Sequence, residues 1–191
     1  AQKPFTIAMK LVDWEEHLGV GCEPNRGKTF HNGDGGMVAI IKDAKNRSTS
    51  WDCVIPSSGG KDSTYQALWA RSKGLNPILV TASTCDLSVI GRKNLENLKN
   101  LGFDTIEITN SFKTRSKLNK ISLELIGDIS WPEHVSIFTT PIKFALSYKI
   151  PLILYGENPQ IEYGGPEKSL SNHNLDRKWM EEFGGLIGLR V

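Results

Sequence analysis

Residues 53–64 read Cys-Val-Ile-Pro-Ser-Ser-Gly-Gly-Lys-Asp-Ser-Thr, and this stretch decides the fold. An apolar run over 53–55 is followed by two glycines, and then by a helical pattern with apolar residues at 65, 68 and 69. A strand, a glycine-rich turn and a helix N-terminus in this order form a cradle for an anion. The glycines admit a close backbone approach, and the first helical turn presents N–H groups at the positive end of the helix dipole. The stretch therefore predicts a binding site for a phosphate chain.

Two common phosphate-binding patterns do not match this loop. A Walker A loop needs G-x-x-x-x-G-K-[ST], but Asp62 follows Gly60-Lys61, and Ile55 stands where the first glycine belongs. The dinucleotide pattern G-x-G-x-x-G fails as well. Residues 58–63 instead resemble the SGGxDS signature of the PP-loop ATP pyrophosphatases, which split ATP between its α- and β-phosphates and hold the pyrophosphate in this loop. A chance Ser/Gly turn is the alternative, and the strand and helix patterns on both sides disfavour it.

The composition is that of an ordinary soluble globular chain. It has 191 residues, of which 39% are hydrophobic and 23% charged, which suits one domain with short additions. The net charge of +2 is too small to indicate a nucleic acid or a membrane surface as partner. The three cysteines, at 22, 53 and 85, form no C-x-x-C motif. We expect a cytoplasmic protein that binds neither nucleic acid nor membrane.

The hydrophobic pattern divides the chain into two parts. Residues 1–50 read as a loop-rich N-terminal extension with a short helix at 13–16, a loop over 19–36, and a helix from 37 to about 47. Residues 51–191 read as the PP-loop domain. Its expected strands are 51–56, 77–81, 105–108 and 151–155. Three of its expected helices are 62–73, 131–149 with an interruption at Pro141, and 175–183. A fourth carries Leu95, Leu98 and Leu101, and a fifth has a face formed by Leu118, Ile121, Leu125 and Ile126.

Strands that alternate with helices predict an α/β fold: an open, parallel, twisted sheet with helices on both faces. In such sheets, ligands bind outside the carboxyl ends of the strands. Three loops then share that edge of the sheet, at 57–63, 81–91 and 156–165. The loop signature adds the expectation that the fold is of the PP-loop, adenine nucleotide alpha hydrolase-like type.

Two further blocks narrow the resemblance. Residues 156–165 read Gly-Glu-Asn-Pro-Gln-Ile-Glu-Tyr-Gly-Gly, and residues 131–141 read Trp-Pro-Glu-His-Val-Ser-Ile-Phe-Thr-Thr-Pro. With Ser-Gly-Gly-Lys-Asp-Ser-Thr-Tyr-Gln at 58–66, they resemble the N-acetyl sugar amidotransferases (WbpG and PseA types), a PP-loop family of bacterial surface-polysaccharide pathways. The similarity runs from about residue 51 to the C-terminus. The family's zinc-binding cysteine pairs are absent, so we expect no zinc site, and family members continue beyond residue 191, so the domain can be incomplete at its C-terminal end.

The resemblance implies an ATP-dependent reaction that converts a sugar N-acetyl group into an acetamidino group. ATP with Mg²⁺ would adenylate the amide oxygen, and ammonia would then replace AMP. Water at the activated carbon would only regenerate the amide, so the site must exclude water. The implied partners are an N-acetylated sugar or nucleotide sugar and a glutaminase subunit resembling HisH as the ammonia donor. The oligomeric state is open, with a homodimer among the expectations.

The phosphate loop supplies the nucleotide-binding residues. We expect the β- and γ-phosphates to be held by backbone N–H groups and hydroxyls of the segment that comprises Ser58, Gly59, Gly60, Lys61, Asp62, Ser63 and Thr64. Lys61 either neutralises phosphate charge or points to solvent, and Asp62 either orients Mg²⁺ or caps the helix. Thr81, at the end of the second strand, either meets the adenosine or is a plain strand end.

The remaining candidates lie in the two other blocks. Together with Lys61 and Asp62, Glu157 and Asn158 are the candidate catalytic residues, because a carboxylate in that loop can accept a proton from the ammonium nucleophile. The substrate candidates are Glu133, His134, Glu157, Asn158, Glu162 and Tyr163. For the loop residues the alternative is solvation, for Glu133 and His134 it is helix capping, and for Tyr163 it is packing.

Two other functions stay open at this point. PP-loop enzymes that thiolate tRNA share the loop, but they usually need a cysteine pair or a strongly basic face, and neither is visible here. A partial module that binds nucleotide without turnover is the second alternative.

Overall fold

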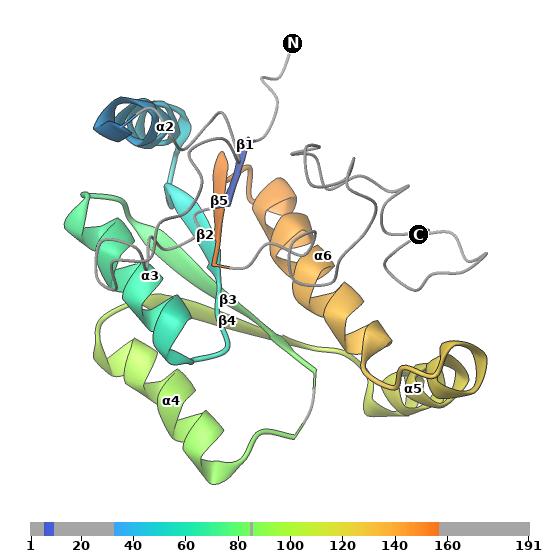
Figure 1. Ribbon diagram of the computed structural model, residues 1–191. Helices are drawn as coiled ribbons and strands as arrows, with labels where there is room; N and C mark the ends of the chain where they lie inside the picture. The colour runs from blue at the N-terminus through green and yellow to red at the C-terminus, as the bar shows by residue number, and fades with distance from the viewer. Residues whose placement is uncertain (1–5, 10–32, 85, 157–191) are drawn as a thin grey trace.

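The apolar strand patterns form one five-stranded parallel sheet in the computed structural model, which describes residues 6–9, 33–84 and 86–156 (Figure 1). In spatial order the strands are β1 (Thr6–Met9), β5 (Leu152–Tyr155), β2 (Cys53–Pro56), β3 (Pro77–Ser83) and β4 (Asp104–Thr109). The helices are α2 (Gly33–Arg47), α3 (Lys61–Ser72), α4 (Val89–Asn100), α5 (Phe112–Ile126) and α6 (Trp131–Ser147). None of the described helices combines the length and the apolar character that a membrane span requires.

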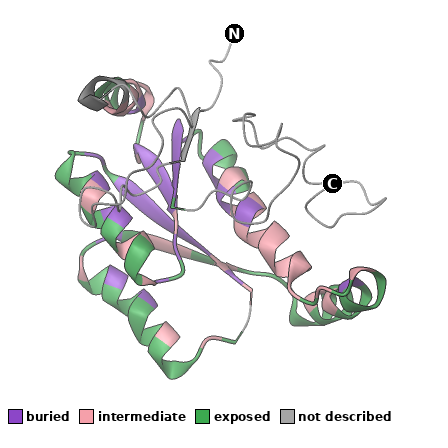
Figure 2. Ribbon diagram, viewed as in Figure 1, coloured by how far each residue is buried: buried purple, intermediate pink, exposed green. Residues whose placement is uncertain are grey.

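Alternate residues of the central strands serve two separate cores. On β2, Cys53 and Ile55 pack with buried residues of α2, α3 and α4, whereas Val54 packs with buried residues of α6. β5 divides in the same way, with Leu152 and Leu154 on the first face and Ile153 on the second. Strands buried on both faces read as continuous apolar runs. The burial colours show this arrangement, with the strands at the centre buried and the outer faces of α3, α4 and α5 exposed (Figure 2).

The chain winds outward from β2 in two directions. It first runs through α3 to β3 and through α4 to β4, and it then returns through α5 and α6 to β5 on the other side of β2. The helices α3 and α4 cover one face of the sheet and α6 covers the other (Figure 1). The winding therefore reverses between β2 and β5, and ligands of open parallel sheets bind at such a switch point, beyond the carboxyl ends of the strands. We call this end of the sheet the carboxyl edge.

Most of the predicted elements within the described residues are confirmed, with three exceptions. Gly33–Gly36 were expected to be loop but begin α2, and the edge strand β1 was not predicted. Pro141 was expected to interrupt the helix, but α6 continues through it. Pro141 is fully buried, and the buried Phe138 and Phe144 lie on either side of it along the helix, so packing holds the helix where a backbone hydrogen bond is missing. The expected helices at 13–16 and 175–183 lie outside the described residues.

Candidate phosphate-binding site

The segment 57–60 connects β2 with α3, and together with the first turn of α3 it contains the predicted phosphate loop. Gly59 has a φ of 78°, a left-handed conformation that side chains rarely adopt. A Cβ at Gly59 would stand 3.0 Å from the backbone nitrogen of Leu95 and 3.1 Å from the carbonyl carbon of Asn94. The loop therefore lies directly against the backbone of α4, and only glycine fits at this contact.

Ser57 ties the loop to the first turn of α3. Its hydroxyl accepts a hydrogen bond from the N–H of Gly59 at 3.2 Å and donates one to the Ser63 hydroxyl at 3.0 Å. Ser63 in turn donates to the carbonyl of Gly60 at 3.2 Å, and the backbone N–H of Ser57 donates to the carbonyl of Val80 on β3 at 3.0 Å. Ser57 is 6% exposed, so it supports the loop from inside. Sequence analysis missed it, although the inward period-two pattern of Cys53 and Ile55 extends to position 57.

The helix α3 begins without a side-chain cap. Its N-cap residue is Gly60, whereas the N-cap residue of α4, Ser88, accepts a hydrogen bond from the N–H of Gly91 at 3.1 Å. The first N–H groups of a helix have no partner within the helix, so an uncapped helix end that follows a glycine loop suits an anion. Lys61 and Asp62 lie in this first turn with exposed side chains. Asp62 is therefore not the N-cap residue, and its predicted role toward Mg²⁺ stays a prediction.

The part of the chain that the structure describes contains no preformed metal centre. Over residues 6–9, 33–84 and 86–156, no group of three or more His, Cys, Asp or Glu side chains is arranged to hold a metal ion. A nucleotide-bound Mg²⁺ needs only one or two carboxylates, since phosphate oxygens and water complete its shell. Asp62 at the loop suits that smaller requirement.

Gln66 is a second residue that sequence analysis missed. It lies on the second turn of α3, is 2% exposed, and has no hydrogen-bond partner for either amide atom among the described residues. Its Oε1 lies 3.5 Å from the point where a Cβ of Gly156 would stand. Gly156 directly follows β5, so the amide lies at the carboxyl edge near the switch point. Gln66 lies three residues after Ser63 and four after Asp62, so all three share one side of α3. This spacing was the sequence signal that could have identified Gln66 as a site residue.

Thr81 lies on β3 rather than at its end. The strand continues two residues further, to Ser83, and the side chains of Thr81 and Ser83 are buried. Thr81 is the Cα partner of Glu107 on β4, whereas Val80 is the partner of Pro56 at the end of β2. Thr81 is therefore next to the start of the phosphate loop, and its predicted contact with adenosine stays a prediction.

A charged pair connects α4 with β4 near this edge. Nη1 of Arg92 lies 2.8 Å from both carboxylate oxygens of Glu107. Burial alone would raise the pKa of Glu107, but hydrogen bonds from Ser83 and Arg92 and the charges of Arg92 and Lys99 lower the pKa below its usual value. Glu107 therefore stays ionised at neutral pH and pairs with the first half of α4, against which Gly59 packs.

The candidate residues on α6, Glu133 and His134, lie at the same edge of the sheet, where α6 meets α5. The Tyr155 hydroxyl at the end of β5 donates to the carbonyl of Phe138 at 2.7 Å, so the first half of α6 extends past the carboxyl edge. Glu133 accepts a hydrogen bond from Asn119 of α5 at 3.1 Å. The side-chain hydrogen bond from Ser130 is the main cause that lowers the pKa of Asp128, and the charge of His134 contributes. The observed partners of Glu133 and Asp128 thus belong to the α5–α6 corner, which gives these residues a local structural role.

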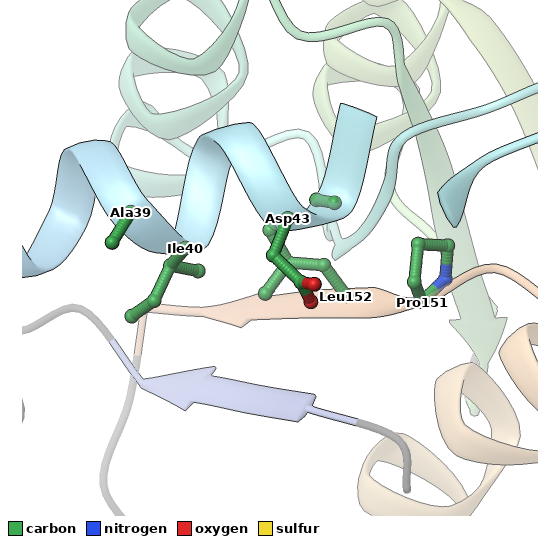
Figure 3. Close-up of a pocket in the computed structure, with 6 residues that line it drawn as sticks. Ala39, Ile40, Asp43, Pro151 and Leu152 are labelled. Carbon is green, nitrogen blue, oxygen red and sulfur yellow. The ribbon is translucent and has the colours of Figure 1, made fainter. Parts of the chain in front are cut away.

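Four further candidates, Glu157, Asn158, Glu162 and Tyr163, lie outside the described residues. A hollow of about 220 Å³ lies elsewhere, between α2 and the start of β5, and Figure 3 shows its lining. Its lining residues are Ala39, Ile40, Asp43, Ala44, Pro151 and Leu152. Pro151 and Leu152 are at the amino end of β5, opposite the phosphate loop, and the lining is mostly apolar. We therefore assign the candidate site to the loop and not to this hollow.

Comparison with known proteins identifies the fold. No family model and no curated protein matches the chain. Among solved structures, the NMN synthetase of Francisella tularensis is similar with a TM-score of 0.51 and 16% identity, over 68% of this chain and 55% of that one. A predicted subunit of tRNA methyltransferase from Methanocaldococcus jannaschii is similar with a TM-score of 0.41 and 22% identity, over 62% of this chain and 60% of that one. The chain thus spans less than two thirds of either structure. The sheet and the similarity to NMN synthetase confirm the expected α/β fold, an open parallel sheet with helices on both faces.

Proposed function

We propose that this protein is a PP-loop enzyme that cleaves ATP between its α- and β-phosphates. The observation that carries the proposal is the phosphate loop, in which a left-handed Gly59 and the uncapped first turn of α3 lie at the carboxyl edge beside the switch point. Backbone N–H groups at a helix start bind phosphate without any side-chain charge. The Ser57 network and the close contact with α4 hold this cradle in shape before a ligand arrives.

The finer proposal is the reaction that the sequence blocks suggest. The acetamido oxygen of an N-acetyl sugar attacks the α-phosphorus of ATP, a new P–O bond forms, and pyrophosphate leaves. Ammonia then adds to the activated carbon, the C–O bond breaks, AMP leaves, and one proton is released to give the acetamidino sugar. The phosphate loop favours the first step by binding the leaving pyrophosphate, which carries more charge than it did within ATP.

The residue roles within this proposal are unequal. Gly59, Gly60 and Ser63 form the pyrophosphate cradle, with Lys61 and Asp62 at its rim as candidates for charge neutralisation and Mg²⁺ binding. Glu157 and Asn158 follow Gly156 in sequence and are the proposed contacts to ammonia and sugar. The Glu133–His134 pair, with Glu162 and Tyr163, is the proposed remainder of the sugar site. A glutaminase subunit would supply ammonia, because free water at the activated carbon would waste ATP.

Mass spectrometry of reaction products tests the proposal. The protein is incubated with Mg²⁺-ATP, ammonium and a panel of N-acetylated nucleotide sugars and nonulosonic acids. AMP, pyrophosphate and a sugar whose amide oxygen has become NH are expected together. Asp62→Asn should reduce all three products alike, whereas Glu124→Gln on the exposed side of α5 should change none. AMP without an amidine would reject the sugar substrate, and bound ATP without AMP would indicate a module that binds without turnover.

A further inference from the structure

The Gln66 carboxamide has hydrogen-bonding capacity that the described part of the protein does not use. The side chain is 2% exposed, and both Nε2 and Oε1 lack a partner among the described residues. A buried amide in this condition is costly, because it has given up its hydrogen bonds to water without replacement. Such a group calls for an explanation, and a ligand that supplies both missing partners is one.

The position of the carboxamide is that of a ligand contact. Side chains on a helix lean toward its N-terminus, so Gln66 extends from the second turn of α3 back toward the phosphate loop. Its Oε1 faces Gly156, where the missing Cβ would stand 3.5 Å away. Gly156 follows β5, and the phosphate loop follows β2. The amide therefore lies near Gly156, directly after β5, on the side of α3 that extends toward the phosphate loop after β2, and these two strands are neighbours at the switch point.

Phosphate groups alone cannot satisfy both polar atoms of the Gln66 amide. Phosphate oxygens at neutral pH accept hydrogen bonds, so they satisfy Nε2 but leave Oε1 next to an anion. Oε1 needs an N–H or O–H donor beside the acceptor that Nε2 needs. In ATP, only the nucleoside offers both: the adenine edge with its amino group and ring nitrogen, which pairs with Gln in a bidentate manner, and the ribose hydroxyls.

We propose that Gln66 binds the nucleoside half of the nucleotide whose phosphates occupy the loop. This inference rests on the proposed function, because it assumes that the bound phosphate chain belongs to a nucleoside triphosphate. Gln66 thereby makes the site selective for a nucleotide over inorganic polyphosphate, a selectivity that the backbone cradle alone does not provide.

Gln66→Met provides the test, since methionine keeps the side-chain length and removes both polar atoms. We would measure the melting temperature of the ligand-free protein and the dissociation constants of Mg²⁺-ATP and of inorganic triphosphate, with Ser72→Ala, at an exposed position of the same helix, as control. The ligand-free variant should melt at the wild-type temperature or above, because an unsatisfied buried amide has been removed. ATP should bind about 10- to 30-fold more weakly, as expected for two neutral hydrogen bonds, and triphosphate should bind as before.

Three outcomes would overturn the inference. A lower melting temperature of ligand-free Gln66→Met would show that the amide has a partner within the protein. Equal effects on ATP and triphosphate, or none on either, would show that Gln66 does not contact the nucleoside. If the wild type binds neither ligand, the proposed function fails along with the inference. If the wild type binds triphosphate, and Gln66→Met binds ATP as tightly as the wild type does, the inference alone fails.

Analogues then separate the base from the ribose. Inosine triphosphate replaces the adenine amino donor by an acceptor, and the 2′- and 3′-deoxy forms of ATP each remove one hydroxyl. The analogue that weakens binding to wild type but not to Gln66→Met names the group that the amide contacts. If every analogue weakens both proteins equally, Gln66 contacts neither group and the inference fails.

Discussion

Gly59 meets two separate demands, and each can be measured. Its φ of 78° disfavours any side chain, and its contact with α4 leaves no room for a Cβ. Gly127 provides a matched control, because its φ is 73° but nothing lies within 4 Å of its added Cβ. We expect Gly127→Ala to lower the free energy of unfolding by about 1–2 kcal/mol through backbone strain alone. Gly59→Ala should cost about 1–3 kcal/mol more through steric overlap.

Urea denaturation of the two variants tests this expectation, and pyrophosphate binding adds a second readout. Gly59→Ala should weaken pyrophosphate binding because the loop must move away from α4, and Gly127→Ala should leave it unchanged. Equal losses of stability would mean that the loop does not pack against α4 as described.

Glu107 predicts a pH dependence with a definite sign. Its pKa in the folded protein is lowered from the ordinary value of 4.5, so its stabilising contribution is present above that value and is lost as the pH falls through the lowered one. Its side chain is 33% exposed, so solvent screening limits the contribution to about 1 kcal/mol or less. The difference in unfolding free energy between wild type and Glu107→Gln should be constant near pH 7 and shrink below pH 4.5.

Chemical denaturation at a series of pH values measures this difference. Glu96→Gln serves as control, because Glu96 also pairs with a cation of α4 but is 60% exposed. A gap between wild type and Glu107→Gln that persists at low pH would contradict the assignment of the effect to the ionised carboxylate.

Single residues also show where sequence reasoning succeeds. Gly59 could be placed because its left-handed backbone conformation requires glycine, and the local sequence pattern carries that requirement. Ser57 and Gln66 could not, because their importance depends on which strand and which loop lie beside them. Their spacing indicates which face of the strand or helix they share with other residues, but it does not show what lies against that face.

At the scale of elements, Tyr155 connects β5 with α6. Burial raises the pKa of its hydroxyl, which therefore stays protonated and donates to the Phe138 carbonyl at all ordinary pH values. We expect Tyr155→Phe to lower the free energy of unfolding by about 1 kcal/mol, since one buried hydrogen bond is lost while the ring packing with Phe138 remains. Tyr148→Phe, at a residue 53% exposed, is the control. Equal stability of wild type and Tyr155→Phe would contradict a stabilising role for this bond.

Elements were predictable wherever the hydrophobic period was unbroken. The buried runs of β2, β3 and β5 and the Leu95–Leu98 stripe of α4 were all placed correctly. Two of the three exceptions, at Pro141 and β1, have a tertiary cause. Proline usually ends a helix, but Pro141 is held by its buried neighbours. Glycine usually marks a loop, but Gly33–Gly36 are the first turn of α2. The four residues of β1 form a strand because β5 offers a free edge, which no local pattern announces.

At the scale of the whole molecule, stability should be unevenly distributed. All four residues of β5 are buried, and so are three of the four in β2, whereas Ser122 is the only buried residue of α5. The predicted apolar face of α5 is largely exposed, with Leu118 at 46% and Leu125 at 73%. We expect amide hydrogen exchange to be slowest in the strands β2, β3 and β5. Among the described helices, we expect it to be fastest in α5.

Hydrogen exchange followed by mass spectrometry checks this ranking against α6, which packs against α5 and buries four residues. Exchange in α5 as slow as in β2 would mean that its apolar face is covered in solution. Sequence reasoning found the helix but not its exposure, because periodicity shows which residues share a face and not whether anything lies against it.

The position of β5 sets the order in which the site can be completed during synthesis. β2, the phosphate loop and α3 leave the ribosome early, yet β5 enters between β1 and β2 and is the last described strand to emerge. Until it arrives, β2 has an open side and the switch point does not exist. Nascent chains that end before residue 155 therefore contain the complete phosphate-loop signature at 58–63, but they lack the β5 side of the crevice. Nucleotide binding then indicates that β5 has joined the sheet.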